Sequence, residues 1–290
     1  MSTTNHGEYF IPEPSKWPVV GTVALTTTVI GAVNTLHSGS TSLFLIAGFL
    51  LIAYLLFGWF GTVINESMGG HYNEQVDHSF RLGMMWFIFS EVMFFAAFFG
   101  ALFYARTYAV PWLGGAGNNA ATHEFLWPAF EAAWPVLSNP GELFKAPEEA
   151  MGAMGLPAIN TAILLTSSVT LTWAHHALRA GNRKHLNIGM ILTVLLGISF
   201  LILQVEEYIH AYSELGLTLD SGIYGSTFFL LTGFHGFHVT MGTTMLIVIL
   251  IRCFKGHFTA DNHFGFEAVA WYWHFVDVVW LGLFIFVYWL

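Results

Sequence analysis

Residues 82–104 read LGMMWFIFSEVMFFAAFFGALFY, an apolar run with a single charged side chain, Glu91, near its centre. The run is long enough to cross about 30 Å of hydrocarbon as a helix. An ionised carboxylate at that depth is costly, so Glu91 must be protonated, paired inside a helical bundle, or in contact with water or a partner subunit. We interpret Glu91 as a functional intramembrane carboxylate. The alternative is a protonated acid that hydrogen-bonds a neighbouring helix only as part of the packing.

The composition of the whole chain indicates the same apolar environment. Hydrophobic residues make up 55% of the 290 residues and charged residues only 9%, whereas a soluble domain has about 25% charged residues. The formal net charge is −9, and the basic residues lie beside apolar runs rather than in a patch, which argues against binding to nucleic acid. The only cysteine, Cys253, excludes a disulfide framework, a thiolate zinc site and c-type haem attachment.

Six further runs are apolar and long enough to span a membrane as helices. Pro18 and Pro157 precede runs, where a missing N–H is harmless, and Pro111 falls in a long loop with four other prolines. We therefore predict an all-α, polytopic membrane protein of seven transmembrane helices, with residues 1–290 as one membrane domain. The predicted spans are 19–36, 43–64, 82–104, 158–178, 188–208, 224–251 and 266–290.

The basic residues predict the orientation of these spans. The positive-inside rule places the side with more Lys and Arg in the cytoplasm. We predict a cytoplasmic N-terminus with residues 1–16 as a tail, a C-terminus outside, and an outer-side loop over residues 106–156 whose glycines and prolines argue against a folded domain. Seven basic residues fall on the inner side, Lys16, Arg81, Arg179, Arg183, Lys184, Arg252 and Lys255, and two on the outer side, Arg106 and Lys145.

Several further polar side chains lie inside predicted spans. His235 and His238 are three residues apart, as are His274 and Asp277, and Glu207 lies towards the end of the fifth span. Because polar groups avoid lipid, we expect these five to form a buried polar network. A metal or haem site made from the three histidines and Asp277 is one alternative, since imidazoles and carboxylates on facing helices bind metals. A proton relay that links Glu91, Asp277 and Glu207 is another.

Six motifs resemble a known family. They are SEVMFF (90–95), TWAHH (172–176), YGSTFF (224–229), TGFHGFH (232–238), NHFGFE (262–267) and WYWHFVDVVW (271–280). In this order they resemble subunit III of the haem–copper cytochrome c oxidases of the aa3 type, over essentially the whole chain. The enlarged outer-side loop resembles the bacterial rather than the mitochondrial form, which implies a bacterial inner (plasma) membrane with the C-terminus in the periplasm.

The resemblance implies an accessory subunit of a respiratory, proton-translocating oxidase. This chain would then hold no redox centre and no metal, because haem a, haem a3, CuA and CuB would belong to partner subunits. Subunit I would be a direct partner and subunit II a member of the same complex, which oxidises cytochrome c and reduces dioxygen to water. For Glu91 the resemblance implies a role in proton uptake or oxygen access, without making it a catalyst.

The resemblance also implies a fold with bound lipid. The first two helices would be splayed from a bundle of the remaining five. The cleft between this pair and the bundle would hold phospholipids. A basic pair can engage a phosphate, and a tryptophan suits the membrane interface. The matching lipid-binding positions are Trp59, Glu66, His71, Arg81 and Arg252.

Three rival classes of protein are weighed against this interpretation. A retinal-binding seven-helix protein is disfavoured because residues 266–290 contain no lysine for a Schiff base. An independent proton-coupled transporter is a conceivable alternative, although the sequence supplies no substrate site or broken helix. A scaffold subunit with no functional protonation is the serious competitor, and comparison of proton pumping by the oxidase with and without the chain would discriminate it best.

Overall fold

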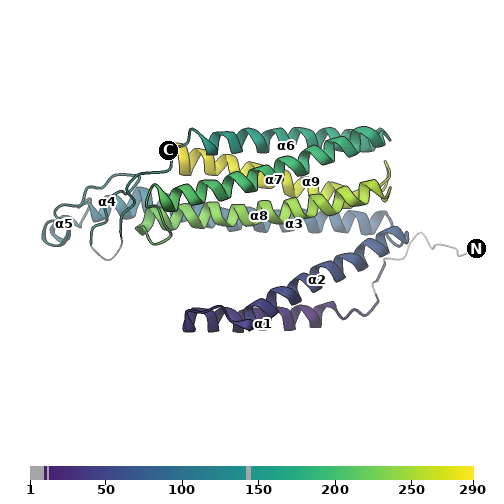
Figure 1. The fold of residues 1–290 in the computed structure, drawn as a ribbon, viewed down its shortest axis with the longest axis horizontal. Coiled ribbons are helices and arrows are strands. Elements are labelled where there is room, and N and C mark those ends of the chain that lie inside the picture. Colours follow the sequence, from purple (N-terminus) through teal and green to yellow (C-terminus); the bar gives the residue numbers. More distant parts are fainter. Residues whose placement is uncertain (1–9, 12, 142–144) are drawn as a thin grey trace, which may run out of the picture. The chain divides into compact units, whose positions relative to one another are not determined.

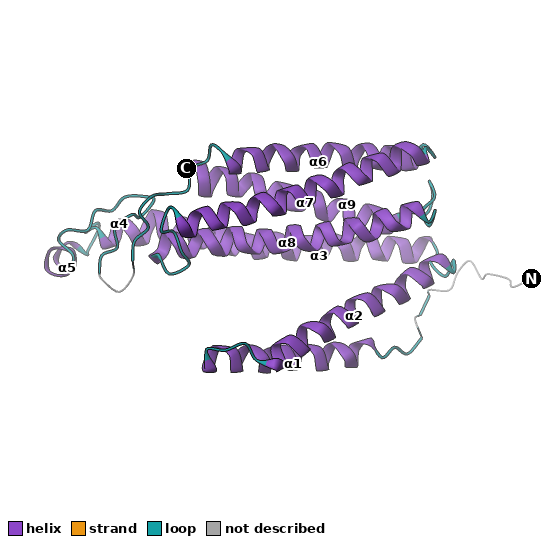
Figure 2. Cartoon of the chain, viewed as in Figure 1, coloured by secondary structure: helices purple, strands orange, loops and turns teal. Residues whose placement is uncertain are grey.

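A computed structural model describes residues 10–11, 13–141 and 145–290, and over these residues it contains helices and loops but no strand (Figures 1 and 2). The elements are α1 (Trp17–Ser38), α2 (Leu43–Met68), α3 (Glu74–Tyr104), the π-helical η1 (Ala105–Ala109), α4 (Val110–Leu113), α5 (Ala120–Leu126), α6 (Leu156–Arg179), α7 (Arg183–Ser213), α8 (Gly222–Phe254), α9 (Phe264–Leu283) and the π-helical η2 (Phe284–Trp289).

Seven of these helical stretches, among the described residues, are long and apolar enough to cross a membrane. They are Trp17–Ser38, Leu43–Met68, Glu74–Leu113, Leu156–Arg179, Arg183–Ser213, Gly222–Phe254 and Phe264–Trp289. The prediction of an all-α protein with seven spans is thereby confirmed. The chain is a multi-pass membrane protein.

The helix ends differ from the predicted span ends. α3 begins at Glu74 rather than residue 82, and α7 runs from Arg183 to Ser213 rather than over 188–208. Hydropathy marks only the part of a helix that suits hydrocarbon, whereas backbone hydrogen bonds continue into polar flanks. The third span continues to Leu113, so the long loop begins later than residue 106, and Pro111 lies in the first turn of α4 instead of the loop. Pro111 follows directly on the π-helical turn η1, where the regular hydrogen-bond pattern of α3 has already changed, so its missing N–H falls at an existing interruption of the helix.

The chain divides into two compact units, Met1–Leu82 and Gly83–Leu290, with the boundary inside α3. In the first unit α1 packs on α2. The two backbones come close at Gly31 and Gly48: a Cβ atom on Gly31 would lie 2.2 Å from the backbone N of Leu45, and one on Gly48 would lie 2.3 Å from Oγ1 of Thr28. In lipid there is no hydrophobic driving force between helices, so their association depends on close van der Waals packing, which small residues at the contact allow.

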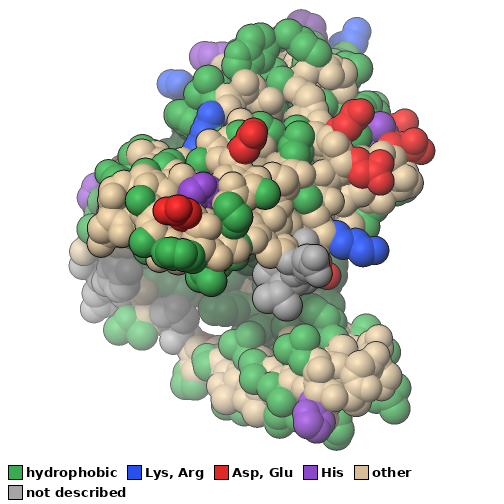
Figure 3. All heavy atoms as spheres, turned by 90° about the vertical axis from the view of Figure 1, so that its left-hand side faces the viewer, with side chains coloured by type: hydrophobic (Ala, Val, Ile, Leu, Met, Phe, Trp, Pro, Cys, Tyr) green, Lys and Arg blue, Asp and Glu red, His purple; other side chains and the backbone are tan. Residues whose placement is uncertain are grey.

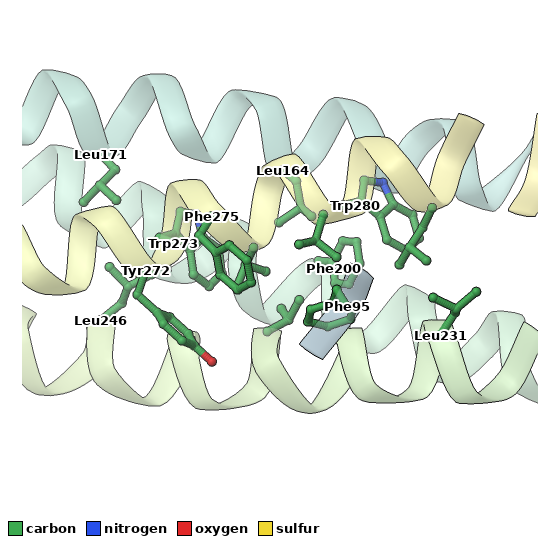
Figure 4. Close-up of a cluster of buried hydrophobic side chains, with 14 of the residues drawn as sticks. Phe95, Leu164, Leu171, Phe200, Leu231, Leu246, Tyr272, Trp273, Phe275 and Trp280 are labelled. Carbon is green, nitrogen blue, oxygen red and sulfur yellow. The ribbon is translucent and has the colours of Figure 1, made fainter. Parts of the chain in front are cut away.

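The core of the second unit lies among α6, α7, α8 and α9, which pack on one another. Trp273 of α9 is fully buried there (Figure 4). A Cβ atom on Gly197 of α7 or on Gly242 of α8 would lie 2.9 Å from its indole ring, so both glycines make room for it. The indole Nε1 donates to Oγ of Ser167 on α6 at 2.8 Å. One side chain therefore holds four helices in register.

Candidate functional site

Glu91 of α3 is hydrogen-bonded to His238 of α8. Oε2 of Glu91 lies 2.9 Å from Nε2 of His238. The His238 side chain is 8% exposed and that of Glu91 21% exposed, so the carboxyl lies at the rim of the bundle. Nδ1 of the same imidazole lies 2.6 Å from the carbonyl oxygen of Phe234. The hydrogen bond therefore crosses from one helix to another at a point where the histidine is already engaged by its own helix.

The two hydrogen bonds of His238 limit where its protons lie. A carbonyl oxygen can only accept, so Nδ1 carries a proton and donates it to Phe234. One further proton must then lie between Nε2 of His238 and Oε2 of Glu91. Either a neutral acid donates to a neutral imidazole, or an imidazolium donates to a carboxylate. The pair has no net charge in both forms, which suits an apolar environment.

Aromatic rings surround this pair. Phe95 meets the imidazole of His238 edge to face at 4.9 Å between ring centroids, and Tyr272 stacks on it at 6.3 Å. Phe94 packs against Phe234 at 5.0 Å. These rings lower the local dielectric, which strengthens the hydrogen bond between Glu91 and His238 and raises the cost of breaking it.

His274 and Asp277 of α9 share a partner on α6. Ser168 donates its hydroxyl hydrogen to Oδ2 of Asp277 in a short hydrogen bond, and its oxygen lies 2.8 Å from Nδ1 of His274. Because the serine hydrogen is used by the aspartate, Nδ1 of His274 is the donor to Ser168. Asp277 is buried, whereas His274 is half-exposed. This group joins α6 to α9 and leaves out the other predicted members of the network.

His235 and Glu207 have different partners again. Nε2 of His235 donates to the carbonyl oxygen of Val276 at 3.2 Å, and its ring packs on Trp280 at 5.0 Å. Glu207 is fully buried, and its Oε1 accepts from the hydroxyl of Tyr288 at 2.5 Å. The five predicted network residues thus lie in four separate groups, and Glu91 joins one of them. The three histidines and Asp277 are not brought together as a single set of metal ligands in the described structure.

A different group of possible ligands does come together. Among the described residues, His175, His263 and Glu267 offer ligand atoms that all lie within 4.8 Å of one another. These residues lie in the motifs TWAHH (172–176) and NHFGFE (262–267), which nothing in the sequence connects with each other. The spacing of four between His263 and Glu267 was the available signal, because residues four apart share a helix face. That α6 and α9 meet at this end could not be read from spacing.

The predicted lipid-binding residues are distributed over both units. Trp59 of α2 is half-exposed, and Glu66 accepts a hydrogen bond from the hydroxyl of Tyr72 at 2.9 Å. Burial, and the hydrogen bond to Glu66, raise the pKa of the Tyr72 phenol. His71 stacks on Phe10 at 5.5 Å between ring centroids. All three predicted residues belong to the first unit. Glu66 and His71 lie at the C-terminal end of α2, where Tyr72 and Phe10 contact them, whereas Trp59 lies nine residues before that end.

The two predicted basic lipid ligands differ in their surroundings. Arg81, at the end of the first unit, pairs with Asp77 one turn earlier, with Nε 2.7 Å from Oδ2. Arg252, in the last turn of α8 in the second unit, places its guanidinium carbon 4.3 Å from the ring centroid of Phe258. The charge of Arg81 is therefore offset within the chain, whereas that of Arg252 rests on an aromatic face.

Comparison with known proteins finds one family that matches nearly the whole chain. The family model of cytochrome c oxidase subunit III matches residues 7–124 and 123–290. Cytochrome c oxidase subunit 3 of Oryctolagus cuniculus is 41% identical over 282 residues, and the same subunit of Rattus norvegicus and of Rhinoceros unicornis is 42% identical. Each alignment covers 97% of this chain and 96% of the relative.

Proposed function

Because this chain belongs to the cytochrome c oxidase subunit III family, we propose that it acts as an accessory subunit without a redox centre of its own. The haems and copper ions would reside in subunits I and II, and subunit I would be the direct partner. The chain would stabilise subunit I, hold phospholipid, and support proton uptake or oxygen access. It would lie in a bacterial inner membrane with the N-terminus in the cytoplasm and the C-terminus in the periplasm.

The observation that carries the proton-uptake part of this proposal is the pair formed by Glu91 and His238. Oε2 of Glu91 and Nε2 of His238 share one proton across a distance of 2.9 Å. The pair is neutral whether the acid or the imidazole carries that proton, so it can remain in a membrane without an uncompensated charge. Glu91 is 21% exposed while His238 is nearly buried, so the carboxyl is the side of the pair that a partner or water can reach. A group with these properties can accept and release a proton without taking part in electron transfer.

The outward face of α3 supports a role in stabilising a partner subunit. Trp86, Phe87, Phe89 and Met93 of the second unit are exposed, large and apolar, and they flank Glu91 along the helix. Lipid tails solvate such a face, but a partner helix covers it with closer packing.

The described ends of the second unit support the proposed orientation. Figure 3 shows carboxylate side chains at the end that faces the viewer, where the loops after α3 and after α7 lie. The carboxylates of these loops include Glu124, Glu131, Glu148, Glu149, Glu214 and Asp220. The opposite end carries Arg179, Arg183, Lys184, Arg252 and Lys255, which the positive-inside rule places in the cytoplasm.

Reconstitution of the oxidase with and without this chain tests the proposed function. Both preparations should reduce oxygen at first, because the redox centres lie elsewhere. The preparation without the chain should lose proton pumping or activity over many turnovers, and adding the chain back should restore it. Equal pumping and equal lifetime in the two preparations would leave only a scaffold role and would contradict the proposal.

A further inference from the structure

The motifs TWAHH and NHFGFE are not used by the proposed function, yet they meet in the second unit. His175 lies in the last two turns of α6, His263 immediately precedes α9, and Glu267 lies in the first turn of α9. Figure 1 shows the end of α6 and the beginning of α9 at the end of this unit that is opposite to α4 and α5. We propose that His175, His263 and Glu267 form a binding site for a divalent cation of the zinc class.

The distances within this group fit a single small ion. Nε2 of His263 lies 3.2 Å from Oε1 of Glu267, and Nε2 of His175 lies 3.5 Å from the same oxygen. A tetrahedral zinc ion with bonds of about 2.0–2.1 Å holds its ligand atoms about 3.3 Å apart. Two of the three distances between ligand atoms therefore match those around a zinc ion, and the third lies within 4.8 Å.

His263 gives an independent reason to expect a ligand. Its side chain is 9% exposed, and neither ring nitrogen makes a hydrogen bond among the described residues, although Nε2 lies close to Glu267. Nε2 of His175 is likewise buried without a hydrogen bond in the described structure. Buried polar atoms are nearly always satisfied, because leaving one unpaired is destabilising. A metal ion would satisfy both Nε2 atoms at once.

The type of ligand and the surrounding charge together select the class of ion. Two imidazoles and one carboxylate suit zinc and the later first-row metals, whereas calcium and magnesium prefer sets made only of oxygen. The site lies at the N-terminus of α9, where the helix dipole disfavours a cation. The positive charge of Arg252 of α8 is also close, beside Gly265 in the first turn of α9. An ion held mainly by charge would bind poorly here. Coordination by imidazole nitrogen is what would retain zinc.

Three protein ligands leave a fourth position for water or for a group from a partner. The ion would join the end of α6 to the beginning of α9, which are separated by more than eighty residues of chain. It would add to the hydrogen bonds that Thr161, Ser167 and Ser168 of α6 make with α9. This site is distinct from the pair of Glu91 and His238. It also modifies the expectation that the chain holds no metal, because a zinc ion supplies no redox chemistry.

Binding of ZnCl2 to the full chain in lipid nanodiscs tests the site. Competition with a coloured chelator should give one tightly bound ion per chain. His263→Gln and His175→Gln should weaken binding by at least about 100-fold, because loss of even an outer partner of a zinc ligand costs about 10- to 100-fold. The matched control is His176→Gln, which changes the exposed neighbouring histidine on α6 and should bind zinc as the unchanged chain does.

Two further measurements do not depend on the folding of the histidine variants. Glu267→Gln keeps the shape of the side chain and should also weaken binding. X-ray absorption of zinc on the unchanged chain should show two imidazoles and oxygen ligands. The proposal is overturned if the unchanged chain binds no zinc more tightly than His263→Gln does, or if the spectrum shows a sulfur ligand from Cys253 or no imidazole. Proton pumping is not measured, so the proposed function stands or falls separately.

Discussion

Oε2 of Glu91 on α3 and Nε2 of His238 on α8 lie 2.9 Å apart, in a position where Nδ1 of His238 already donates to Phe234. The orientation of the imidazole is thus determined by its own helix, and its remaining nitrogen is aimed at the carboxyl. A single proton joins the two side chains. This relationship makes Glu91 a group whose hydrogen bond and whose proton can be tested separately.

Glu91→Gln should preserve the hydrogen bond and remove the exchangeable proton. The new amide can donate to Nε2 of His238, because Nδ1 carries the imidazole proton. Assembly and initial oxygen reduction should survive with a loss of less than about threefold, or about 0.7 kcal/mol in the barrier. Proton pumping over many turnovers, measured in vesicles, should decline faster than in the unchanged oxidase. Complete loss of electron transfer would make Glu91 catalytic and contradict an accessory role.

Glu91→Lys is the matched disruptive change. It places a long cation where the structure holds a neutral pair among aromatic rings, and such a cation is costly at bilayer depth. We expect less of the assembled complex, measured as the amount of this chain that co-purifies with subunit I. Normal assembly would indicate that Glu91 faces water rather than lipid or a partner.

Chemical modification should report on the environment of Glu91 directly. Only the protonated acid adds to a carbodiimide, and Glu91 is reached through an apolar rim rather than from bulk water. An apolar carbodiimide should therefore label Glu91, while a water-soluble one should not. Mass spectrometry of the labelled peptide provides the measurement, and Glu206, near the outer end of α7, provides an internal control for the water-soluble reagent.

Trp273 should be among the most important residues for stability. It is fully buried, its ring fills the space left by Gly197 and Gly242, and it donates to Ser167. Trp273→Ala should lower the free energy of unfolding of the second unit by about 3–5 kcal/mol. Trp289→Ala removes an exposed tryptophan and should change it by less than about 0.5 kcal/mol. Unfolding in detergent micelles, followed by tryptophan fluorescence and circular dichroism, would compare the two.

Reporter fusions should reveal the orientation of the helices. The end of the second unit that we propose to be cytoplasmic carries Arg179, Arg183 and Lys184 around the α6–α7 turn. A reporter inserted at the exposed Asn182 should therefore be active in the cytoplasm, and one fused after Leu290 should be active outside it. The opposite pattern would overturn the orientation, and two reporters on the same side would overturn the odd number of spans.

The seven spans could be predicted because each needs only about 20 local apolar residues, a signal that does not depend on what the helix packs against. The partners of the polar residues could not. The spacing of three between His235 and His238 predicts a shared network, but residues at this spacing lie about 60° apart around a helix. That angle is enough to direct His235 to Val276 of α9 and His238 to Glu91 of α3. Which helix lies on each side is a property of the tertiary packing.

The group of His175, His263 and Glu267 could not be predicted from the sequence either, because it also depends on which helices are neighbours. The spacing of His263 and Glu267 is local and readable, but their meeting with His175 depends on which helix ends are neighbours. The family resemblance did not supply this connection, because it identified the two motifs without linking them. Contacts between elements distant in the sequence therefore required the structure.

Arg252 is the residue that we expect to hold lipid at the proposed cytoplasmic end of the second unit. Arg252 packs on Phe258, and no carboxylate forms an ion pair with its guanidinium among the described residues. Arg81 is already paired with Asp77. Arg252→Ala should therefore reduce the phospholipid that co-purifies with the chain, and Arg81→Ala should reduce it less, because a phosphate binds most strongly to a cation that has no carboxylate partner within the chain.

Lys255→Ala, which removes an exposed charge three residues away, serves as the control for charge alone. Lipid would be counted per chain by mass spectrometry. Unchanged lipid in Arg252→Ala, or an equal loss in Lys255→Ala, would show that Arg252 does not hold a specific phospholipid.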